Sequence, residues 1–249
     1  GDEFRRYNLH LLELASDDTD IICQVSLRPD ESVATAASKL KGRLSKFLRS
    51  ALDADAKVKI LGKGYFACTV GNNTRKTVIQ YLEKQGLHHG YLERPLPPVY
   101  VRTFNDVDVP AVHLDAAHSA TLLRYHLVFG THRRRGIFTQ TEAARVVAAW
   151  KDRQKEQQCA VLKVSFVPDH VHVAVRIHPS VVPRKLMAVL MNAAEERMEA
   201  EFAEIMIRHS AGRLWETGAY VGSFGELTSS AVRRAIDRWK RGGRLGAGL

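Results

Sequence analysis

Two histidines separated by one residue form the strongest candidate for chemistry in this sequence. His170 and His172 lie in residues 168–175, where aliphatic side chains fill most of the run, and this pattern predicts a β-strand. Side chains alternate across a strand, so both imidazoles point to the same face. Two imidazoles held on one face can bind a divalent metal, although an isolated pair of this kind is more often two half-buried histidines. The rest of the chain decides between the two.

The composition sets the class of protein. The chain has 249 residues, 45% hydrophobic and 26% charged, which is typical of one large or two small globular domains. The net charge of +10 favours a polyanionic partner. No apolar run is long enough to span a bilayer, and no secretory signal is visible. Three cysteines without a metal spacing favour a reduced, cytoplasmic protein. The first residue is not methionine, which fits a processed or truncated end.

Hydrophobic periodicity predicts two structural units joined by a linker. The first unit contains strands at 7–15, 20–28 and 64–71 and helices at about 32–50 and 74–85. Four prolines make regular structure improbable in residues 91–120, which we expect to be the linker. The second unit is expected to contain strands at 123–129, 160–167, 168–175 and 215–225 and helices at about 140–157, 182–203 and 228–241. The predicted domains are therefore residues 1–90 and 121–249.

The two units resemble each other in sequence. Residues 64–71 align with residues 218–225 at a constant offset of 154, and the same offset places Tyr81 on Ala235. It also places Gln85 on Trp239. Upstream the offset is 150, which places Asp20 on His170 and Ile22 on His172. The chain is therefore predicted to be a tandem duplication in which each copy has lost something different. The first copy keeps the tyrosine, and the second keeps the histidines.

Several motifs together resemble one known family, the HUH-superfamily single-tyrosine transposases. These include the REP-associated tyrosine transposases and the small enzymes of single-strand insertion sequences. The second copy carries the resemblance at residues 125–129 (YHLVF), at the basic loop that follows, and at 168–172 (PDHVH). The first copy carries it at residues 40–43, 64–66 and 78–85. The resemblance covers both copies but not the linker.

The resemblance implies a fold, an activity and a set of site residues. The fold would be α+β, with two ferredoxin-like domains, each an antiparallel sheet backed by helices, packed as a pseudo-dimer. The activity would be that of a single-stranded DNA endonuclease and strand transferase, acting on DNA that often carries a hairpin. Cleavage would proceed through a covalent 5′-phosphotyrosine, with Tyr81 as the nucleophile. His170, His172 and Gln85 would hold a divalent metal, Mg²⁺ or Mn²⁺. The protein would be cytoplasmic and nucleoid-associated, in a bacterium or archaeon.

The chemistry of the residues supports one composite site. Tyr81 and Gln85 are four residues apart on a predicted helix, so both can enter the same pocket. A tyrosine has an ordinary pKa near 10 and needs a metal or a base to attack a phosphate. If each copy used its own tyrosine, both sites would be dead. If the tyrosine helix acts in trans, one site keeps Tyr81, Gln85 and the histidine pair, and the other keeps none. We therefore predict a single-chain pseudo-dimer with one active site, which could act as a monomer.

Basic residues indicate where DNA would bind. They gather on the helix at 32–50, where a solvated face is about as good an explanation as phosphate binding, and in the strongly basic loop after residue 130. The predicted DNA-binding residues are Lys39, Lys41, Arg43, Arg133, Arg134 and Arg135.

Two other functions remain open on the sequence alone. The first is a catalytically silent, domesticated protein that binds a DNA or RNA hairpin through its basic surface. The second, weaker alternative is a zinc-stabilised structural module, which is disfavoured because no cysteine accompanies the histidines at a closed-site spacing. A single tyrosine also permits only one phosphotyrosine at a time. That limit favours nicking and joining, or a domesticated role, over symmetric two-ended strand exchange.

Overall fold

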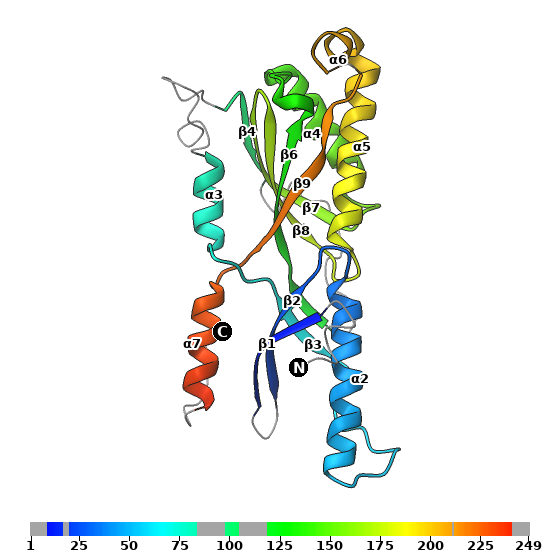
Figure 1. The fold of residues 1–249 in the computed structure, drawn as a ribbon, viewed down its shortest axis with the longest axis vertical. Coiled ribbons are helices and arrows are strands. Elements are labelled where there is room, and N and C mark those ends of the chain that lie inside the picture. The colour runs from blue at the N-terminus through cyan, green and yellow to red at the C-terminus, as the bar shows by residue number, and fades with distance from the viewer. Residues whose placement is uncertain (1–8, 17–19, 84–97, 105–118, 211, 241–249) are drawn as a thin grey trace.

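A computed structural model describes residues 9–16, 20–83, 98–104, 119–210 and 212–240. The molecule is elongated. A five-stranded sheet with its helices occupies one end, and a two-stranded hairpin beside a long helix occupies the other (Figure 1). The predicted α+β class is confirmed. No helix among the described residues is long and apolar enough to cross a membrane.

The large sheet is antiparallel throughout, in the order β4–β7–β8–β6–β9. Two of its three inner strands, β7 and β8, are buried almost completely, which explains their nearly continuous apolar sequence. The histidine pair lies on β8, at the middle of the sheet. The strands are β4 (Tyr100–Thr103), β6 (Arg124–Thr131), β7 (Cys159–Val167), β8 (His170–Ile177) and β9 (Trp215–Phe224).

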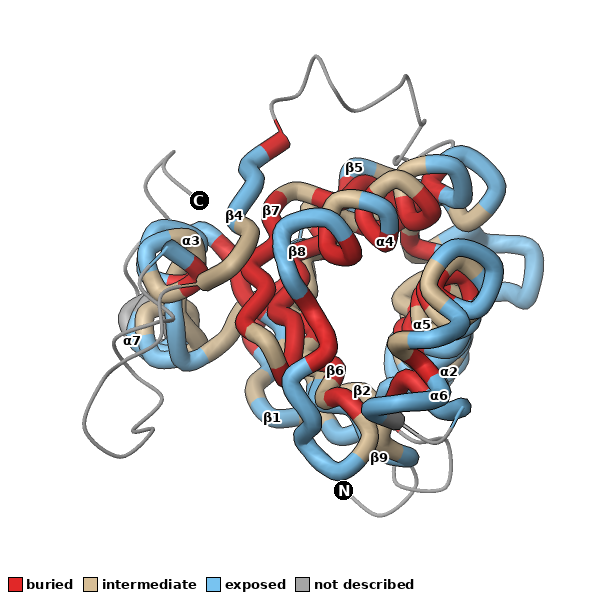
Figure 2. The backbone as a smooth tube through the Cα atoms, turned by 90° about the horizontal axis from the view of Figure 1, so that it is seen from above, coloured by how far each residue is buried: buried red, intermediate tan, exposed pale blue. Residues whose placement is uncertain are grey.

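Two long helices, α4 (Gln140–Arg153) and α5 (Pro183–Glu201), cover one face of this sheet. The side chain of Trp150 is fully buried between them, and its indole nitrogen donates a hydrogen bond of 2.7 Å to the Leu190 carbonyl. Burying one such large apolar side chain stabilises the fold by roughly 2–3 kcal/mol. Buried residues gather between the sheet and these helices (Figure 2). This face is the core, which leaves the opposite face of the sheet for the site.

The other end of the molecule is a hairpin of β1 (Leu9–Ser16) and β2 (Ile21–Leu27) with helix α2 (Val33–Ala51). Ser32 caps α2, because its hydroxyl accepts a hydrogen bond from the Thr35 amide. These elements lie close to their predicted positions.

The hairpin β1–β2 is a copy of the hairpin β7–β8. Under the offset of 150, both hairpins have the same strand register, and both carry a β-bulge at the same place. Such a match in register and irregularity supports the predicted duplication more strongly than sequence similarity does. The equivalent pairs are Leu9–Leu27 and Cys159–Ile177 at one end and Ser16–Ile21 and Phe166–Val171 at the other, with bulges at Leu11/Glu13 and Val161/Lys163.

The segments that lead into two shorter helices, α3 (Arg75–Glu83) and α7 (Ser229–Lys240), cross near the middle of the molecule (Figure 1). At the crossing, the Arg75 amide donates to the Gly225 carbonyl at 2.6 Å, and the Ser229 amide donates to the Gly71 carbonyl at 2.8 Å. The offset of 154 places the donor Arg75 on the donor Ser229 and the acceptor Gly71 on the acceptor Gly225, so the two bonds are equivalent. As a result α3 lies beside the five-stranded sheet and α7 lies beside β1–β2.

The close approach at this crossing requires glycine on both sides. A Cβ atom at Gly71 would lie 2.1 Å from the Ser223 carbonyl oxygen, and one at Gly225 would lie 1.9 Å from the Thr69 carbonyl oxygen. Both distances are far below any real contact, so any other residue would push the two segments apart.

A second pair of reciprocal bonds joins the starts of α2 and α5. The Ala34 amide donates to the Pro179 carbonyl, and the Arg184 amide donates to the Pro29 carbonyl, each at 2.8 Å. The offset of 150 places Ala34 on Arg184 and Pro29 on Pro179, so each bond is the equivalent of the other. Contacts across a two-fold axis are related in the same way. Two separate regions of the molecule therefore show the same reciprocity.

The structure differs from the prediction in the proline-rich segment. The expectation of no regular element in residues 91–120 is wrong at β4 and at β5 (Ser119–Leu122), which pairs in parallel with β3 (Tyr65–Cys68). β4 follows the prolines as an edge strand, a position that tolerates nearby prolines. Helix α6 (Ala203–Ser210) was also not predicted, because the break at Phe202 that separates it from α5 has no glycine or proline.

Candidate active site on the histidine face

The two histidines lie side by side on the face of the sheet opposite the core, which we call the histidine face. Their ring centroids are 4.9 Å apart, and their side chains are almost completely buried. Strand alternation predicts this shared face, and the antiparallel pairing of β8 with both β6 and β7 fixes it rigidly.

His170 is held by an ionic group. Its Nδ1 atom lies 2.6 Å from Asp169 Oδ1 and 3.2 Å from a guanidinium nitrogen of Arg134. Arg134 Nε also pairs with the other carboxylate oxygen of Asp169, at 2.9 Å. The predicted DNA-binding residue Arg134 therefore also orients a histidine, and a strongly bent backbone brings it there, with a positive φ of 53°.

A third histidine, His126 on β6, belongs to the same group. Its Nε2 atom lies 2.9 Å from Nδ1 of His172, and the two rings stack with centroids 5.1 Å apart. Burial lowers the pKa of His126 to about 4, so the ring is neutral near pH 7. His126 is the second letter of the YHLVF motif, and the motif by itself did not predict a role for its side chain. The available signal was strand alternation, which places His126 and Val128 on one face, and Val128 pairs directly with His172.

Helix α3 brings Tyr81 to these rings from the other copy. Its ring centroid lies 5.6 Å from that of His172 and 6.1 Å from that of His126, each in an edge-to-face arrangement. The helix docks through Val78 and Leu82, which are buried against the histidine face together with Ala174 and Phe224. The spacing of four residues between Val78 and Leu82 gives α3 one apolar side, and Tyr81 lies at the border of that side.

An ion pair at the end of α3 adds to this docking. Lys163 on β7 is 1% exposed, and its Nζ atom lies 2.6 Å from a carboxylate oxygen of Glu83, which is 54% exposed. Lys163 follows the bulge in β7, and a bulge changes the direction of the next side chain. Because a buried ammonium needs a counter-charge, Glu83 ties the tyrosine helix to the sheet.

Equivalent elements in the other half of the molecule lack this chemistry. Asp20 and Ile22 occupy the positions of the histidines, and α7 packs against β1–β2 as α3 packs against β7. Arg233 of α7 pairs with Glu13 of β1 at 3.5 Å. We call this region the silent half. Ala235 and Trp239 belong to α7, but their side chains lie outside the described set.

The fit of a metal to the site can be judged from the donors. Both histidines use Nδ1 for protein partners, so Nε2 is the nitrogen that each would turn towards a metal, as is common for ligating histidines. Two oriented imidazoles fit one divalent ion that takes further ligands. In the described part of the chain, no group of three His, Cys, Asp or Glu side chains could hold a metal. The predicted third ligand, Gln85, lies outside the described residues.

The predicted basic residues fall into two groups. On α2, Lys39 pairs with Glu31 at 2.5 Å, and the Lys41 ammonium donates to the carbonyls of residues 62–64, so both have protein partners. Arg43 is half-buried on the same helix. By contrast, Arg133 and Arg135 are exposed on either side of Arg134, which contacts His170. Among the predicted basic residues, Arg134 therefore contacts the histidine pair directly.

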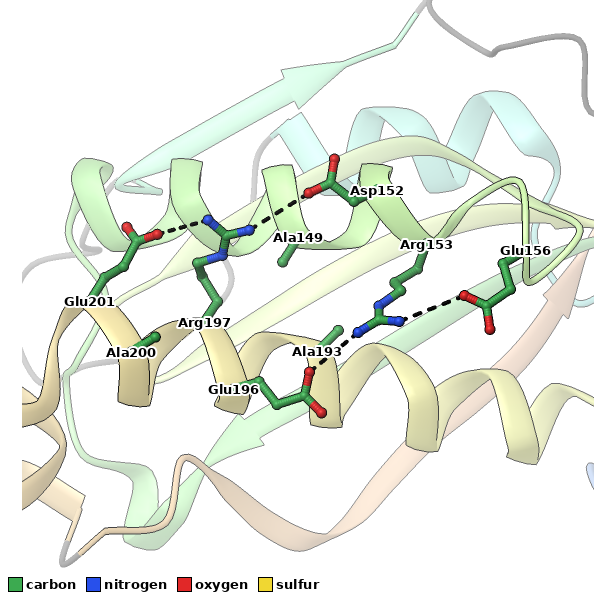
Figure 3. Close-up of a pocket in the computed structure, with 9 residues that line it drawn as sticks. All are labelled: Ala149, Asp152, Arg153, Glu156, Ala193, Glu196, Arg197, Ala200 and Glu201. Atoms are coloured by element: carbon green, nitrogen blue, oxygen red, sulfur yellow. Dashed lines mark hydrogen bonds and ion pairs between the residues drawn. The ribbon is translucent and has the colours of Figure 1, made fainter.

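A shallow groove lies between α4 and α5 (Figure 3). Alanines line it, and two ion pairs cross it, Arg153–Glu196 and Arg197–Asp152. Its charged side chains pair with one another, and it lies on the helix-covered side of the sheet, opposite the histidine face. It therefore contributes nothing to the site.

Comparison with known proteins identifies the class. Residues 3–85 and 119–238 match the family model "Transposase IS200 like", which covers most of the chain. The chain belongs to the IS200-like transposase family. Transposases for insertion sequence element IS200 from Salmonella typhimurium strain LT2 and Salmonella typhi are each 21% identical to it over 132 residues. Each match spans 52% of this chain and 87% of the relative.

Two solved structures show a weaker likeness. A protein of Deinococcus radiodurans R1 assigned as a transposase is 22% identical, with a TM-score of 0.39, and the match covers 50% of this chain and 92% of that one. A REP-associated tyrosine transposase bound to a REP hairpin is 10% identical, with a TM-score of 0.33, and the match covers 48% and 68% of the two chains.

Proposed function

We propose that this chain nicks and joins single-stranded DNA at one composite active site, through a 5′-phosphotyrosine on Tyr81. The observation that carries the proposal is the approach of Tyr81 from one sequence repeat to His172 of the other. A nucleophile, an oriented histidine pair and a basic loop meet at one place. Family membership supports the same class of DNA chemistry.

Each side chain would have a defined part in the reaction. The Tyr81 hydroxyl loses its proton to water and attacks the phosphorus, the bond to the 3′ oxygen breaks, and that oxygen leaves as a 3′ hydroxyl after taking a proton. His170 and His172, with Gln85, would hold a Mg²⁺ or Mn²⁺ ion, which supplies charge for the phosphate oxygens. Asp169 and His126 orient the two histidines. Attack by a 3′ hydroxyl on the phosphotyrosine would reseal the strand.

The same proposal treats the chain as two units, residues 1–90 and 121–249, that act as a single-chain pseudo-dimer. The reciprocal bonds at the crossing and at the starts of α2 and α5 support this organisation. So does the length of the relatives, because one relative matches over 87% of its own chain and takes up only 52% of this one. A second copy of the protein is then not needed to complete the site.

We further propose that the DNA substrate carries a hairpin. The loop after β6 reaches His170 through Arg134, and its exposed arginines Arg133 and Arg135 are available to contact phosphates. The net charge of +10 favours the same class of partner. One tyrosine allows one covalent DNA end at a time, so nicking and joining is the activity expected.

The test is adduct formation. Purified protein is incubated with hairpin-bearing single-stranded DNA and Mn²⁺ or Mg²⁺, then separated on a denaturing gel. The proposal expects a metal-dependent protein–DNA adduct that Tyr81→Phe abolishes while DNA binding remains. Binding without any adduct in the wild-type protein would overturn it and favour the silent hairpin-binding protein instead.

A further inference from the structure

An exposed tyrosine stands on the histidine face beside the candidate site. Tyr220 of β9 pairs with Val128 of β6, and Val128 pairs with His172 of β8. Directly paired residues point to the same side of a sheet, so Tyr220 shares its face with His172. Tyr220 is 58% exposed, whereas His170 and His172 are almost completely buried.

The ring of Tyr220 is held in a definite position. It lies along its own strand over Gly222, because a Cβ atom at Gly222 would be only 2.3 Å from the Tyr220 hydroxyl oxygen. Its edge meets His126, with ring centroids 5.9 Å apart at an angle of 70°. Gly222 has no side chain and therefore leaves room for the Tyr220 ring. The ring packs over Gly222 and against the edge of His126, and the rest of it is exposed to solvent.

A supported, solvent-facing aromatic ring next to a site for single-stranded DNA suits one kind of ligand. Every base has a flat π surface, and stacking on an aromatic side chain binds single strands with little regard to sequence. We propose that Tyr220 is a stacking platform for an unpaired base next to the phosphate that Tyr81 attacks. This inference rests on the proposed function. The platform would fix the strand on the β9 side of the histidines, while α3 closes the other side.

The silent half provides a matched control. Phe66 of β3 corresponds to Tyr220 under the offset of 154, and it is similarly exposed, at 63%. The residue that corresponds to Gly222 is Cys68, which has a side chain where the Tyr220 ring has space. Phe66 is thus a similarly exposed aromatic on the equivalent strand, in the sequence repeat that lacks the histidine pair. Its removal should not affect a DNA strand at the composite site.

The experiment measures binding of the full chain to a fluorescein-labelled 20-mer of dT by anisotropy, without added metal. Tyr220→Ala should weaken affinity by on the order of ten-fold. Tyr220→Trp and Tyr220→Phe should keep nearly wild-type affinity, because each retains a flat ring. Phe66→Ala should bind like the wild type. Unchanged affinity in Tyr220→Ala, or an equal loss in Phe66→Ala or Tyr220→Phe, would overturn the platform.

A second arm separates this inference from the proposed function. Wild type and Tyr220→Ala are both tested for the metal-dependent adduct on hairpin-bearing single-stranded DNA. A wild-type adduct together with unchanged dT binding in Tyr220→Ala would end the stacking proposal and leave the chemistry standing. A ten-fold binding loss without any wild-type adduct would support the stacking surface and contradict the cleavage chemistry. Near-saturating DNA should restore most of the adduct yield to Tyr220→Ala, because the platform acts on binding.

Discussion

The two helices α3 and α7 pack on equivalent hairpins, yet only one of the two packings assembles groups capable of chemistry. α3 carries Tyr81 onto the hairpin with the histidines, whereas α7 packs on the hairpin where Asp20 and Ile22 stand in their place. The backbone is the same in register and in the position of its bulge. The two hairpins therefore differ in their side chains, and they also differ in their neighbours, because β1–β2 is a two-stranded sheet whereas β7–β8 belongs to a five-stranded one.

The ion pairs that tie each helix to its hairpin have opposite polarity. On the histidine side the sheet supplies the cation, Lys163, and the helix supplies Glu83. On the silent side the sheet supplies Glu13, at the position equivalent to Lys163, and the helix supplies Arg233. The two helix residues are not equivalent, because the offset of 154 places Glu83 on Asp237 and Ile79 on Arg233. Each ion pair therefore ties its own helix to its own hairpin and does not by itself select the crossed arrangement.

The largest difference between the halves should come from the nucleophile. Tyr81→Phe removes the hydroxyl that attacks the phosphate, so adduct formation should fall at least about a thousand-fold, as loss of a nucleophile does in other enzymes. The measurement is adduct yield over time on a denaturing gel. Tyr65→Phe, at a tyrosine of β3 outside the site, is the control and should react like the wild type. A Tyr81→Phe protein that still forms the adduct would rule out the assigned nucleophile.

Replacing a histidine should have the next largest effect. His170→Ala removes one of the two proposed imidazole ligands, and the adduct rate should fall by on the order of a hundred-fold or more if the proposed metal is lost. Asp20→Ala changes the equivalent position of the silent half and should leave the rate within about two-fold, as surface changes away from a site usually do. Equal losses in both variants would mean that the halves are not functionally distinct.

His126 should affect the metal rather than the nucleophile. His126→Phe keeps the stacked ring but removes the nitrogen bonded to His172, so Mn²⁺ affinity should fall roughly ten- to a hundred-fold. Titration of the adduct rate with Mn²⁺ measures this shift, and saturating metal should restore most of the rate. A lower rate at every Mn²⁺ concentration, with no change in midpoint, would contradict an orienting role.

Breaking the Lys163–Glu83 ion pair should have a smaller effect, and exchanging the two charges should reverse it. Glu83→Lys places two cations together and should weaken α3 docking by about 1–2 kcal/mol, between the values for exposed and buried pairs. The double variant Lys163→Glu, Glu83→Lys should recover much of the loss. Adduct rates and the free energy of unfolding measure the two effects, with Arg233→Glu as the silent-half control that alters stability but not the adduct rate. Failure of the double variant to recover, in a folded protein, would argue against a direct contribution of the Lys163–Glu83 pair to docking.

The loop arginines should have the smallest effects. Arg133→Ala and Arg135→Ala should each reduce the salt dependence of DNA affinity by about one counterion and weaken binding a few-fold. The corresponding change at Lys41 should matter less for DNA, because its ammonium already binds three backbone carbonyls. A Lys41→Ala variant with the larger change in salt slope would move the DNA path to α2.

Much of the fold could be predicted because its signals are local. The alternation around His170, the capping residue Ser32 and the spacing of Val78 and Leu82 each specify an element without reference to the rest of the chain. The duplication also predicted which copy loses which residue. The short strand β4 could not be predicted, because it forms only by adding to the edge of a sheet built by distant residues.

The site was partly predictable for the same reason. His170 and His172 are visible as a motif, but the partners that orient them come from separate strands and loops. His126 reaches His172 only through the register between β6 and β8, and Arg134 reaches Asp169 only through a left-handed backbone turn. Such contacts are set by tertiary structure, and no spacing in the sequence reveals them.

The most direct test of the composite site is to find the residue that carries the DNA. The wild-type protein is reacted with hairpin-bearing single-stranded DNA and Mn²⁺, digested with protease and nuclease, and mapped by mass spectrometry. A nucleotide attached to Tyr81, and lost when His170 of the other repeat is replaced by alanine, is the result that one site built from both halves predicts. A nucleotide on any other tyrosine, or on Tyr81 irrespective of His170, would contradict it.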